Sequence, residues 1–152
     1  MLIGVISDTH GLMRPEALAA LRGVEHILHA GDVGDAAILA ALREIAPVTA
    51  IRGNVDTSGV CAELPATDVV ELGGSLFYLV HSVRDLDINP KVAGVAMVVS
   101  GHSHKAKVEV KDGVVYFNPG SAGPKRFSLP VTVGFVTVED GVEASVKELV
   151  VG

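Results

Sequence analysis

The sequence predicts an α/β fold in which two mixed β-sheets pack face to face and are flanked by helices. Two observations lead to this expectation. The first half of the chain alternates apolar strand segments with helical segments, whereas the second half is a series of strand segments joined by short turns. Hydrophobic residues make up 49% of the 152 residues and aromatic residues only 4%, so we expect a core of Val, Leu, Ile and Ala between closely packed layers.

The first half of the chain is interpreted as two successive strand-helix-strand units. The first helix begins at Pro15, a residue type favoured at helix starts, and stops at Gly23. Asp35 is placed to cap the second helix, whose apolar residues recur at helical spacing before Pro47. The strands are expected around residues 2–7, 25–29 and 48–51. Two such units in succession predict parallel strands with right-handed crossovers.

The second half is interpreted as three hairpins and one further strand. In each hairpin a pair of turn residues separates two segments rich in β-branched residues, and these pairs are Gly73-Gly74, Asp112-Gly113 and Asp140-Gly141. The further strand, residues 95–99, follows a short stretch without clear periodicity at residues 84–94. Strand-rich hairpins that follow a strand-helix-strand half predict two packed sheets with helices outside.

Length, charge and cysteine content narrow the class of protein. A chain of 152 residues fits one domain, residues 1–152. Its net charge of −6 argues against a nucleic-acid partner, because surfaces that bind nucleic acid are built from Lys and Arg. The single Cys61 excludes an internal disulfide and suits a reducing compartment. The first residues read as a buried strand rather than a signal peptide, and no apolar run approaches the roughly 20 residues that span a bilayer. We therefore expect a cytoplasmic protein without a membrane partner, either monomeric or homo-oligomeric.

Seven side chains of the kinds that bind metals fall in five short segments of the sequence. Each segment directly follows a run of aliphatic residues, so each would lie just past the carboxyl end of a strand, where open α/β sheets place their sites. In extended chain, Asp-x-His and His-x-His also direct two ligands to the same face. The seven residues are Asp8, His10, Asp32, Asn54, His81, His102 and His104.

The composition of this set indicates which metals it suits. Carboxylate, amide and imidazole groups without a thiolate suit Mn, Fe, Co, Ni or Zn better than a sulfur-ligated site. Seven ligands exceed what one catalytic ion with an open position requires, but they suit two ions that share a bridging carboxylate. The residues therefore predict two divalent metal ions per chain.

The ordered motifs that carry these residues resemble a known family. DTH, GD, GNVD, VH and GHSH are similar to the motifs of the calcineurin-like metallophosphoesterases, and within them to the small single-domain phosphodiesterases of bacteria and archaea. The later NPGS, residues 118–121, strengthens the narrower match. The resemblance extends from residue 8 to residue 121 and implies the two-sheet sandwich of that family.

The resemblance also implies an activity and a division of the ligands. One metal would be held by Asp8, His10, Asp32 and His104, and the other by Asp32, Asn54, His81 and His102. The implied reaction is hydrolysis of a small phosphoester, with phosphodiesters favoured, manganese the favoured metal and a metal-bridging hydroxide the nucleophile. The residues expected to act in catalysis are Asp32, as the bridging ligand, together with Asn54 and His81.

Several other polar residues have both a functional and an ordinary interpretation. Asn118 and Arg126 are the candidates for substrate contacts, because an amide or a guanidinium close to the metals could bind a phosphate oxygen. Lys125, Arg52 and Arg84 are weaker candidates of the same kind. His26 and His29 fit a packed strand histidine or one that supports a ligand, and Asp56 fits a residue that closes the turn after Asn54 by accepting backbone amide protons.

Two positions depart from the family pattern. Ser82 follows His81 where many relatives have glycine, so a positive φ at that position would require a different loop. Val55 follows Asn54 where the nuclease and protein-phosphatase branches have a histidine that can protonate the leaving group. Valine cannot donate a proton, so the sequence offers no general acid at this position.

Three alternatives to a phosphodiesterase remain at this stage. A phosphomonoesterase would use the same site. A noncatalytic protein-binding scaffold is suggested by a retromer subunit that shares the fold and has lost catalytic histidines, but those of this chain are intact. A DNA nuclease is disfavoured by the acidic charge and by Val55. Fold alone does not decide among these functions.

Overall fold

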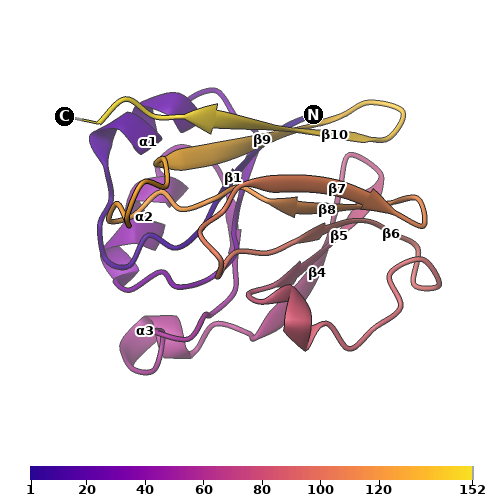
Figure 1. Ribbon diagram of the computed structural model, residues 1–152, viewed down its shortest axis with the longest axis horizontal. Helices are drawn as coiled ribbons and strands as arrows, with labels where there is room; N and C mark the ends of the chain where they lie inside the picture. Colours follow the sequence, from indigo (N-terminus) through magenta and orange to yellow (C-terminus); the bar gives the residue numbers. More distant parts are fainter. Residues whose placement is uncertain (152) are drawn as a thin grey trace.

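The computed structural model describes residues 1–151, within which the strands form two mixed five-stranded sheets (Figure 1). The first sheet has the strand order β10-β9-β1-β2-β3. Its three parallel strands come from the first half of the chain, and the β9–β10 hairpin pairs antiparallel with the first of them, β1. These strands are β1 (Leu2–Ile6), β2 (His26–His29), β3 (Val48–Ala50), β9 (Thr132–Val138) and β10 (Val142–Glu148). The chain therefore returns at its end to complete the sheet with which it began.

The second sheet is built from the middle of the chain, in the order β4-β5-β6-β8-β7. Strands β5, β6 and β8 are parallel, and the two edge strands β4 and β7 pair antiparallel with their hairpin partners. The strands are β4 (Thr67–Leu72), β5 (Ser75–Val80), β6 (Val95–Val99), β7 (Lys107–Lys111) and β8 (Val114–Asn118). Each sheet thus contains three parallel strands, which lie at the centre of the second sheet and at one side of the first.

All three predicted hairpin turns are confirmed. At each turn both named residues have positive φ. In the first two hairpins they are the whole loop between paired strand residues, as in a type I′ turn, whereas in the third hairpin three residues, 139–141, separate the paired Val138 and Val142. The φ values are 59° and 84° at Gly73-Gly74, 53° and 78° at Asp112-Gly113, and 50° and 123° at Asp140-Gly141. Glycine and aspartate tolerate this region, so local sequence sufficed to locate these turns.

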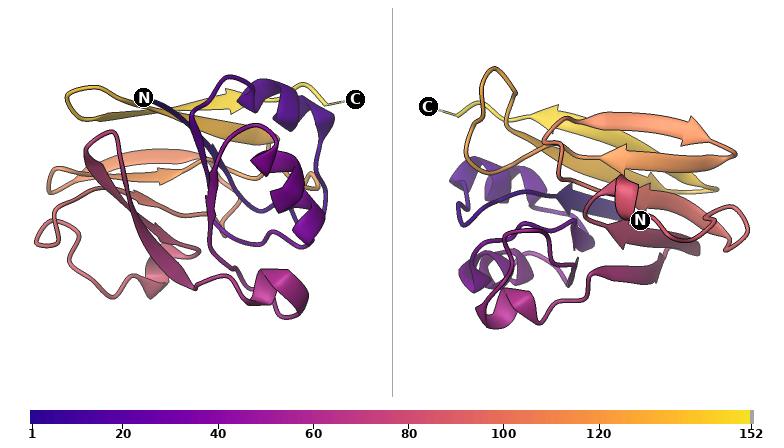
Figure 2. Two further views of the ribbon diagram at one scale, coloured as in Figure 1. Left: turned by 180° about the vertical axis from the view of Figure 1, so that it is seen from behind. Right: turned by 60° about the horizontal axis from the view of Figure 1, so that its bottom comes forward.

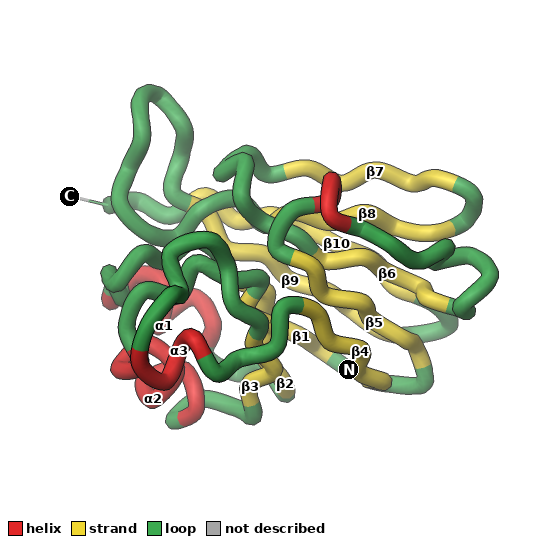
Figure 3. Tube along the Cα trace, turned by 90° about the horizontal axis from the view of Figure 1, so that it is seen from below, coloured by secondary structure: helices red, strands yellow, loops and turns green. Residues whose placement is uncertain are grey.

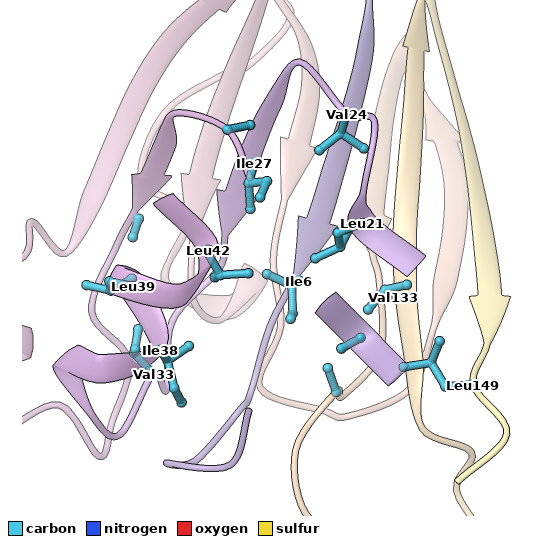
Figure 4. Packing of buried hydrophobic residues seen from close by; sticks show 14 of the residues in the cluster. Ile6, Leu21, Val24, Ile27, Val33, Ile38, Leu39, Leu42, Val133 and Leu149 are labelled. Carbon is cyan, nitrogen blue, oxygen red and sulfur yellow. The ribbon is translucent and has the colours of Figure 1, made fainter. Parts of the chain in front are cut away.

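Two helices cover the outer face of the first sheet. α1 (Pro15–Leu21) has Pro15 in its first turn, and α2 (Ala36–Arg43) is capped by the Asp35 carboxylate, which accepts the backbone N–H of Ala37 at 2.9 Å. Their apolar residues pack on the strands in one cluster, which contains Ile6, Leu21, Ile27, Ile38, Leu39, Leu42 and Val133 (Figure 4). A four-residue helix, α3 (Gly59–Ala62), which the sequence did not indicate, lies between β3 and β4.

A second core fills the space between the sheets, whose strands lie over one another in Figure 3. Its largest fully buried side chains include Phe77 and Phe117 from the second sheet and Ile3 and Leu28 from the first. The outer face of the second sheet has a smaller cluster around Tyr78 and Val98, against which Leu86 and Ile88 from the segment between β5 and β6 pack. In the left view of Figure 2, the indigo and purple helices α1 and α2 lie on one side of the molecule, away from the strands of the second sheet. Helices therefore flank one sheet within residues 1–151, and the second carries only the single 3₁₀ turn η1 (Val83–Asp85).

The topology brings the carboxyl ends of β1, β2, β5 and β6 toward one end of the sandwich. The loops after these strands contact one another: the backbone N–H of Asp8 donates to Gly31 O at 3.0 Å, and that of Gly101 donates to His81 O at 2.9 Å. The predicted ligands from both sheets therefore meet there. In residues 1–151 the structure contains no helix of the length and apolar character that crossing a membrane requires.

Candidate metal centre

Five of the seven predicted ligands lie together at this end of the sandwich. Their ligand atoms form two groups, Asp8 with His10 and His104, and Asp8 with Asp32 and His81, and within each group they lie within 4.8 Å of one another. Asp8 Oδ1 is 3.4 Å from His104 Nε2, and Asp32 Oδ2 is 3.2 Å from His81 Nε2. Residues from four loops and both sheets thus converge on one small volume.

Each carboxylate uses one oxygen to bind protein and turns the other toward the centre. Asp8 Oδ2 accepts the hydroxyl of Ser7 at 2.7 Å and the backbone N–H of His102 at 3.0 Å. Asp32 Oδ1 accepts the backbone N–H of Val55 at 3.0 Å. These bonds fix both carboxylates, so that Asp8 Oδ1 and Asp32 Oδ2 face the imidazoles.

The imidazoles are also held with a ring nitrogen toward the centre. His81 Nδ1 lies 2.7 Å from the carbonyl oxygen of Ala30, which can only accept, so Nδ1 carries the proton and Nε2 presents a lone pair in the neutral ring. The Nε2 atoms of His10 and His104 face each other at 3.3 Å. A lone pair fixed in this way by a backbone carbonyl is the usual arrangement of a metal-binding histidine.

The backbone at these residues has an unusual conformation. Among the non-glycine residues of the chain described here, eight have positive φ, and five of those are predicted ligands. The five are Asp8 (φ 55°), His10 (46°), Asp32 (56°), His102 (70°) and His104 (63°). Such conformations are uncommon even for Asp and His and cluster at functional sites, where surrounding contacts enforce them.

Glycines let neighbouring loops approach the ligands closely. A Cβ added to Gly53 would overlap the Asp32 carboxylate, and one added to Gly101 would overlap both Ser7 Oγ and Asp8 Oδ2. Gly31, at φ 101°, has its backbone against the His81 ring. Any side chain at these positions would displace a predicted ligand.

Burial and mutual charge shift the pKa values at the centre. Burial raises the pKa of Asp8, and it lowers the pKa of His10 and of His104, the latter also because of the positive charge of Arg126. Burial by itself would raise the pKa of Asp32. The hydrogen bonds of Asp32 with His81 and with the Val55 amide outweigh burial, so the pKa of Asp32 is lowered. Burial also works against protonation of His81, yet Asp32 and the Ala30 carbonyl leave its pKa raised.

The other two predicted ligands lie beside the cluster. His102 is exposed, and its ring packs edge-to-face on that of His81 with 5.3 Å between the ring centroids. Asn54 is exposed and lines a hollow together with His81. Neither residue belongs to the two groups above, and these groups share Asp8, whereas the family resemblance assigns the bridging position to Asp32.

His29 and Asp56 hold the loops that carry the predicted ligands. The buried His29 accepts the backbone N–H of Gly31 at Nδ1 (3.1 Å), and its Nε2 lies 3.1 Å from the hydroxyl of Thr9, which itself donates to Val33 O. Burial lowers the pKa of His29 to about 4, so the ring is neutral with its proton on Nε2. These hydrogen bonds connect the loop of Asp8 and His10 to the loop of Asp32.

Asp56 closes the turn after Asn54, as predicted, and also connects two loops. Its carboxylate accepts the backbone N–H groups of Val33, Gly34 and Gly53 at 3.1, 2.9 and 2.9 Å. Three such bonds tie the loop of Asp32 to the loop of Asn54. His26, by contrast, bonds Thr49 Oγ1 on the neighbouring strand at 2.8 Å and takes no part in the centre.

The two predicted substrate contacts lie in different surroundings. Asn118 donates both amide hydrogens to the loop of His102 and His104, to Gly101 O at 2.9 Å and Ser103 Oγ at 3.1 Å, and accepts the Gly120 N–H at 2.9 Å. These bonds favour a role in positioning that loop. Arg126 is exposed, and its charge acts on both His10 and His104.

The two departures from the family pattern are accommodated in the structure. Ser82 has φ −116° and extended backbone, so the position after His81 does not require glycine here. Val55 uses its backbone N–H to hold Asp32, while its side chain is 46% exposed.

Two hollows flank His81 and His102. The first, which we call the His102 hollow, has a volume of about 550 Å³ and is lined among others by Ser82, Arg84, His102, Lys105, Lys107 and Tyr116. The second, the Asn54 hollow, has a volume of about 450 Å³ and is lined among others by Arg52, Asn54, Thr67, His81, Asp85 and Asp87. Both volumes are in the range of ligand sites.

Sequence reasoning did not find several groups that hold the centre in place. They include the hydroxyls of Ser7 and Thr9 and the carbonyl oxygen of Ala30. Ser7 and Thr9 stand next to Asp8 in the sequence, which is a signal that could have been used. A backbone carbonyl has no signature in the sequence, because every residue supplies one.

The donor set of the centre fits divalent metal ions. Among residues 1–151, the buried side-chain atoms without a hydrogen-bond partner include Asp8 Oδ1 and His81 Nε2, which face the centre; the third such atom is His104 Nδ1, on the opposite side of its ring from the Nε2 near Asp8. Buried polar atoms without a partner cost free energy unless a ligand or ion engages them. Two carboxylate oxygens that face three imidazoles supply the donors that such an ion needs.

Comparison with known proteins agrees with this chemistry. Over 95% of its length the chain is 34% identical to a probable metallophosphoesterase of Methanocaldococcus jannaschii and covers 79% of that protein. Its fold matches an archaeal phosphodiesterase (TM-score 0.79, 24% identity, 97% of this chain and 100% of the other). It also matches Vps29 of Entamoeba histolytica in complex with Zn²⁺ (TM-score 0.75, 21% identity, 97% and 99%). The family model of the calcineurin-like phosphoesterase superfamily domain matches residues 1–141, and the chain therefore belongs to that superfamily.

Proposed function

We propose that this protein is a phosphodiesterase that works with two divalent metal ions, manganese being favoured and nickel, iron, cobalt or zinc the alternatives. The observation that carries the proposal is the convergence of Asp8 Oδ1 and Asp32 Oδ2 on the imidazoles of His10, His81 and His104. Without a cation, two buried carboxylate oxygens directed to one place repel each other. Divalent ions would remove that repulsion.

The proposed ligand sets divide the cluster into two. Asp8, His10, Asp32 and His104 would hold one ion, and Asp32, Asn54, His81 and His102 the other. Asp32 Oδ2 lies 3.2 Å from His81 Nε2 and 3.5 Å from His10 Nε2, so it stands between imidazoles assigned to different ions. This position supports Asp32 as the shared ligand, although Asp8 Oδ1 also lies within 3.8 Å of His81 Nε2.

The residues of the chain prepare the site for a phosphoester. When bound, two divalent ions lower the pKa of water and offset the negative charge of the phosphoryl oxygens. Ala30 keeps the His81 lone pair directed to the centre, and Asp56 keeps the Asp32 and Asn54 loops together. Arg126, whose charge reaches His10 and His104, is placed to attract the anionic substrate.

The two hollows favour a diester over a monoester. A phosphodiester carries an organic group on each side of the phosphorus, whereas a monoester carries only one. The His102 hollow and the Asn54 hollow begin at residues assigned to the same ion and offer one space for each organic group. A monoesterase would leave one of these spaces without use.

Two other functions compete with this proposal. A phosphomonoesterase would use the same ligands. A protein-binding scaffold is suggested by the likeness to Vps29, but a scaffold does not require buried ligand atoms without partners.

The deciding experiment compares matched substrates. Metal-stripped protein is reconstituted with Mn²⁺, Ni²⁺, Co²⁺, Mg²⁺ or Zn²⁺ and assayed with bis(p-nitrophenyl) phosphate and with p-nitrophenyl phosphate. We expect metal-dependent hydrolysis with a higher kcat/KM for the diester. Preference for the monoester would assign the first alternative, and absence of hydrolysis of both substrates with every metal would contradict the proposal.

A further inference from the structure

The two hollows beside the proposed metal centre carry opposite charge. Three cationic residues and one carboxylate, namely Arg84, Lys105, Lys107 and Glu109, line the His102 hollow. One cationic residue and two carboxylates, namely Arg52, Asp85 and Asp87, line the Asn54 hollow. The chain as a whole has a net charge of −6, so the excess of cationic residues around the His102 hollow is opposite in sign to the charge of the protein.

Two of these cations have no carboxylate partner in the part of the chain that the structure describes. Lys107 Nζ pairs with Glu109 Oε2 at 3.1 Å, whereas no ion pair involves Arg84 or Lys105 within residues 1–151. Arg84 comes from η1 and Lys105 from the loop after His104, so segments far apart in the sequence bring the two charges to one hollow; η1 is the isolated red turn in Figure 3. Unpaired cations in a concave site are suited to bind an anion.

The His102 hollow borders the proposed catalytic centre at His102. Its wall includes His102 and Ser82, and the ring of His102 packs on that of His81. The remaining wall contains Tyr116, which provides a partly buried aromatic surface. An organic group attached to a phosphorus atom at the centre would therefore extend directly into this hollow.

We propose that the His102 hollow is a specificity site for a second anionic group of the substrate. The preferred substrate is then an asymmetric phosphodiester. The half that carries an additional phosphate occupies the His102 hollow against Arg84 and Lys105, and the neutral half lies toward the Asn54 hollow, whose Asp85 and Asp87 repel anions. This inference rests on the proposed phosphodiesterase function and adds to it the charge and the orientation of the substrate.

The test uses two diesters with the same leaving group. They are the p-nitrophenyl ester of thymidine 5′-phosphate and its analogue with a 3′-phosphate, so the substrates differ only in the second anionic group. We expect the 3′-phosphate to raise kcat/KM on the order of tenfold, the lower end of what hydrogen bonds to charged groups contribute. The gain should decrease with rising salt, because exposed charges are screened.

Variants assign the gain to the hollow. In Arg84→Ala/Lys105→Ala the ratio of the two kcat/KM values should fall to about one, because the cations that recognise the second phosphate are absent. Lys111→Ala is the matched control: Lys111 is an exposed cation on the same strand as Lys107, β7, but does not line the hollow, so the ratio should stay at the wild-type value. A ratio that is unchanged in the double variant, or that falls equally in the control, would overturn the proposal.

A binding measurement separates this proposal from the proposed activity. Calorimetry on the metal-free protein compares thymidine 3′,5′-bisphosphate with thymidine 5′-phosphate, and we expect tighter binding of the bisphosphate that Arg84→Ala/Lys105→Ala abolishes. If bis(p-nitrophenyl) phosphate is hydrolysed but neither probe nor substrate pair shows a preference, the hollow is not an anion site although the activity stands. If no diester is hydrolysed but the bisphosphate binds selectively, the activity fails and the anion site remains.

Discussion

The Nε2 atom of His81 lies 3.2 Å from Oδ2 of Asp32, while the other nitrogen of the same ring lies 2.7 Å from the Ala30 carbonyl oxygen. The ring is thus fixed between two acceptors. In the neutral ring Nε2 presents a lone pair to a carboxylate oxygen, and this contact becomes favourable only when a proton or a cation occupies the space between them. Protons and metal ions therefore compete for the same position.

This competition predicts pH-dependent metal binding. Burial disfavours the charged form, but Asp32 and Ala30 leave the pKa of His81 raised, so the ring retains a second proton at a higher pH than an ordinary histidine. A metal must displace that proton, and its affinity should fall about tenfold per pH unit below the raised pKa for each proton displaced. Activity should fall on the acidic side for the same reason. Calorimetry of Mn²⁺ binding in buffers of different ionisation enthalpy counts the protons; the outcome that contradicts the account is binding without proton release, and His26→Gln serves as the control.

The second prediction distinguishes the two carboxylates. Asp32→Ala should lower metal content more than any other single ligand change, because Asp32 is proposed to contact both ions. The loss of activity should exceed about 100-fold, the upper end of what removal of a group that merely supports a ligand costs. Elemental analysis of Asp32→Ala, Asp8→Ala and the exposed control Glu71→Ala checks this. Two ions retained in Asp32→Ala, with fewer in Asp8→Ala, would transfer the bridging role to Asp8, which the structure places in both ligand groups.

The third prediction concerns stability in acid. Burial lowers the pKa of His29 from about 6.5 to about 4, so the unfolded chain takes up the proton first as the pH falls. Stability should therefore decrease between pH 6.5 and pH 4, and a shift of this size corresponds to about 3 kcal/mol in total. His29→Gln retains an N–H group near Thr9 but does not titrate. Urea unfolding of the metal-free proteins at several pH values should give a smaller pH dependence for this variant, and equal slopes would show that His29 is not a source of acid sensitivity.

The fourth prediction follows from Val55. Hydrolysis of a diester releases an alkoxide or phenoxide, and protonation by a positioned acid typically contributes about 10²–10⁴-fold. Val55 has no proton to donate, so kcat/KM should depend steeply on the pKa of the leaving group, and aryl diesters should react much faster than alkyl diesters such as DNA linkages. The valine side chain is 46% exposed, so a histidine at this position can be accommodated while its backbone N–H still holds Asp32.

Two variants test this interpretation. Val55→His should flatten the dependence on leaving-group pKa, whereas Val55→Ala should retain it. A near-zero slope in the wild-type protein, with chemistry shown to be rate-limiting, would reveal an acid that neither the sequence nor the structure indicates.

The hairpin turns and the cap of the second helix could be predicted because each depends on a few neighbouring residues. The turns at Asp112-Gly113 and Asp140-Gly141 need residues that tolerate positive φ, and the cap at Asp35 needs a short acceptor side chain. That the predicted ligands would lie past the ends of strands could be foreseen because each follows a run of aliphatic residues, and their role as ligands stays a prediction. The helix α3, four residues long, is too short to show a period, and the pairing of β9 with β1 joins the two ends of the chain, which no local signal determines.

The arrangement around the ligands could be predicted only in part. That Asp56 would accept backbone amide protons was foreseen from its place in a turn, but the loops that it joins depend on the fold. Arg84 of η1 lines the His102 hollow together with Tyr116 and Asn118 of β8, and the sequence of residues 84–94 has no period that predicts this. Contacts between segments far apart in sequence follow from the topology of both sheets.

The central claim is that two metal ions at this centre hydrolyse a phosphodiester. The most direct test is a titration of the metal-stripped protein with Mn²⁺ while the initial rate of bis(p-nitrophenyl) phosphate hydrolysis is followed and bound metal is counted. The account predicts that the rate reaches its plateau when two ions are bound per chain. A full rate with one bound ion, or two bound ions without hydrolysis, would contradict it.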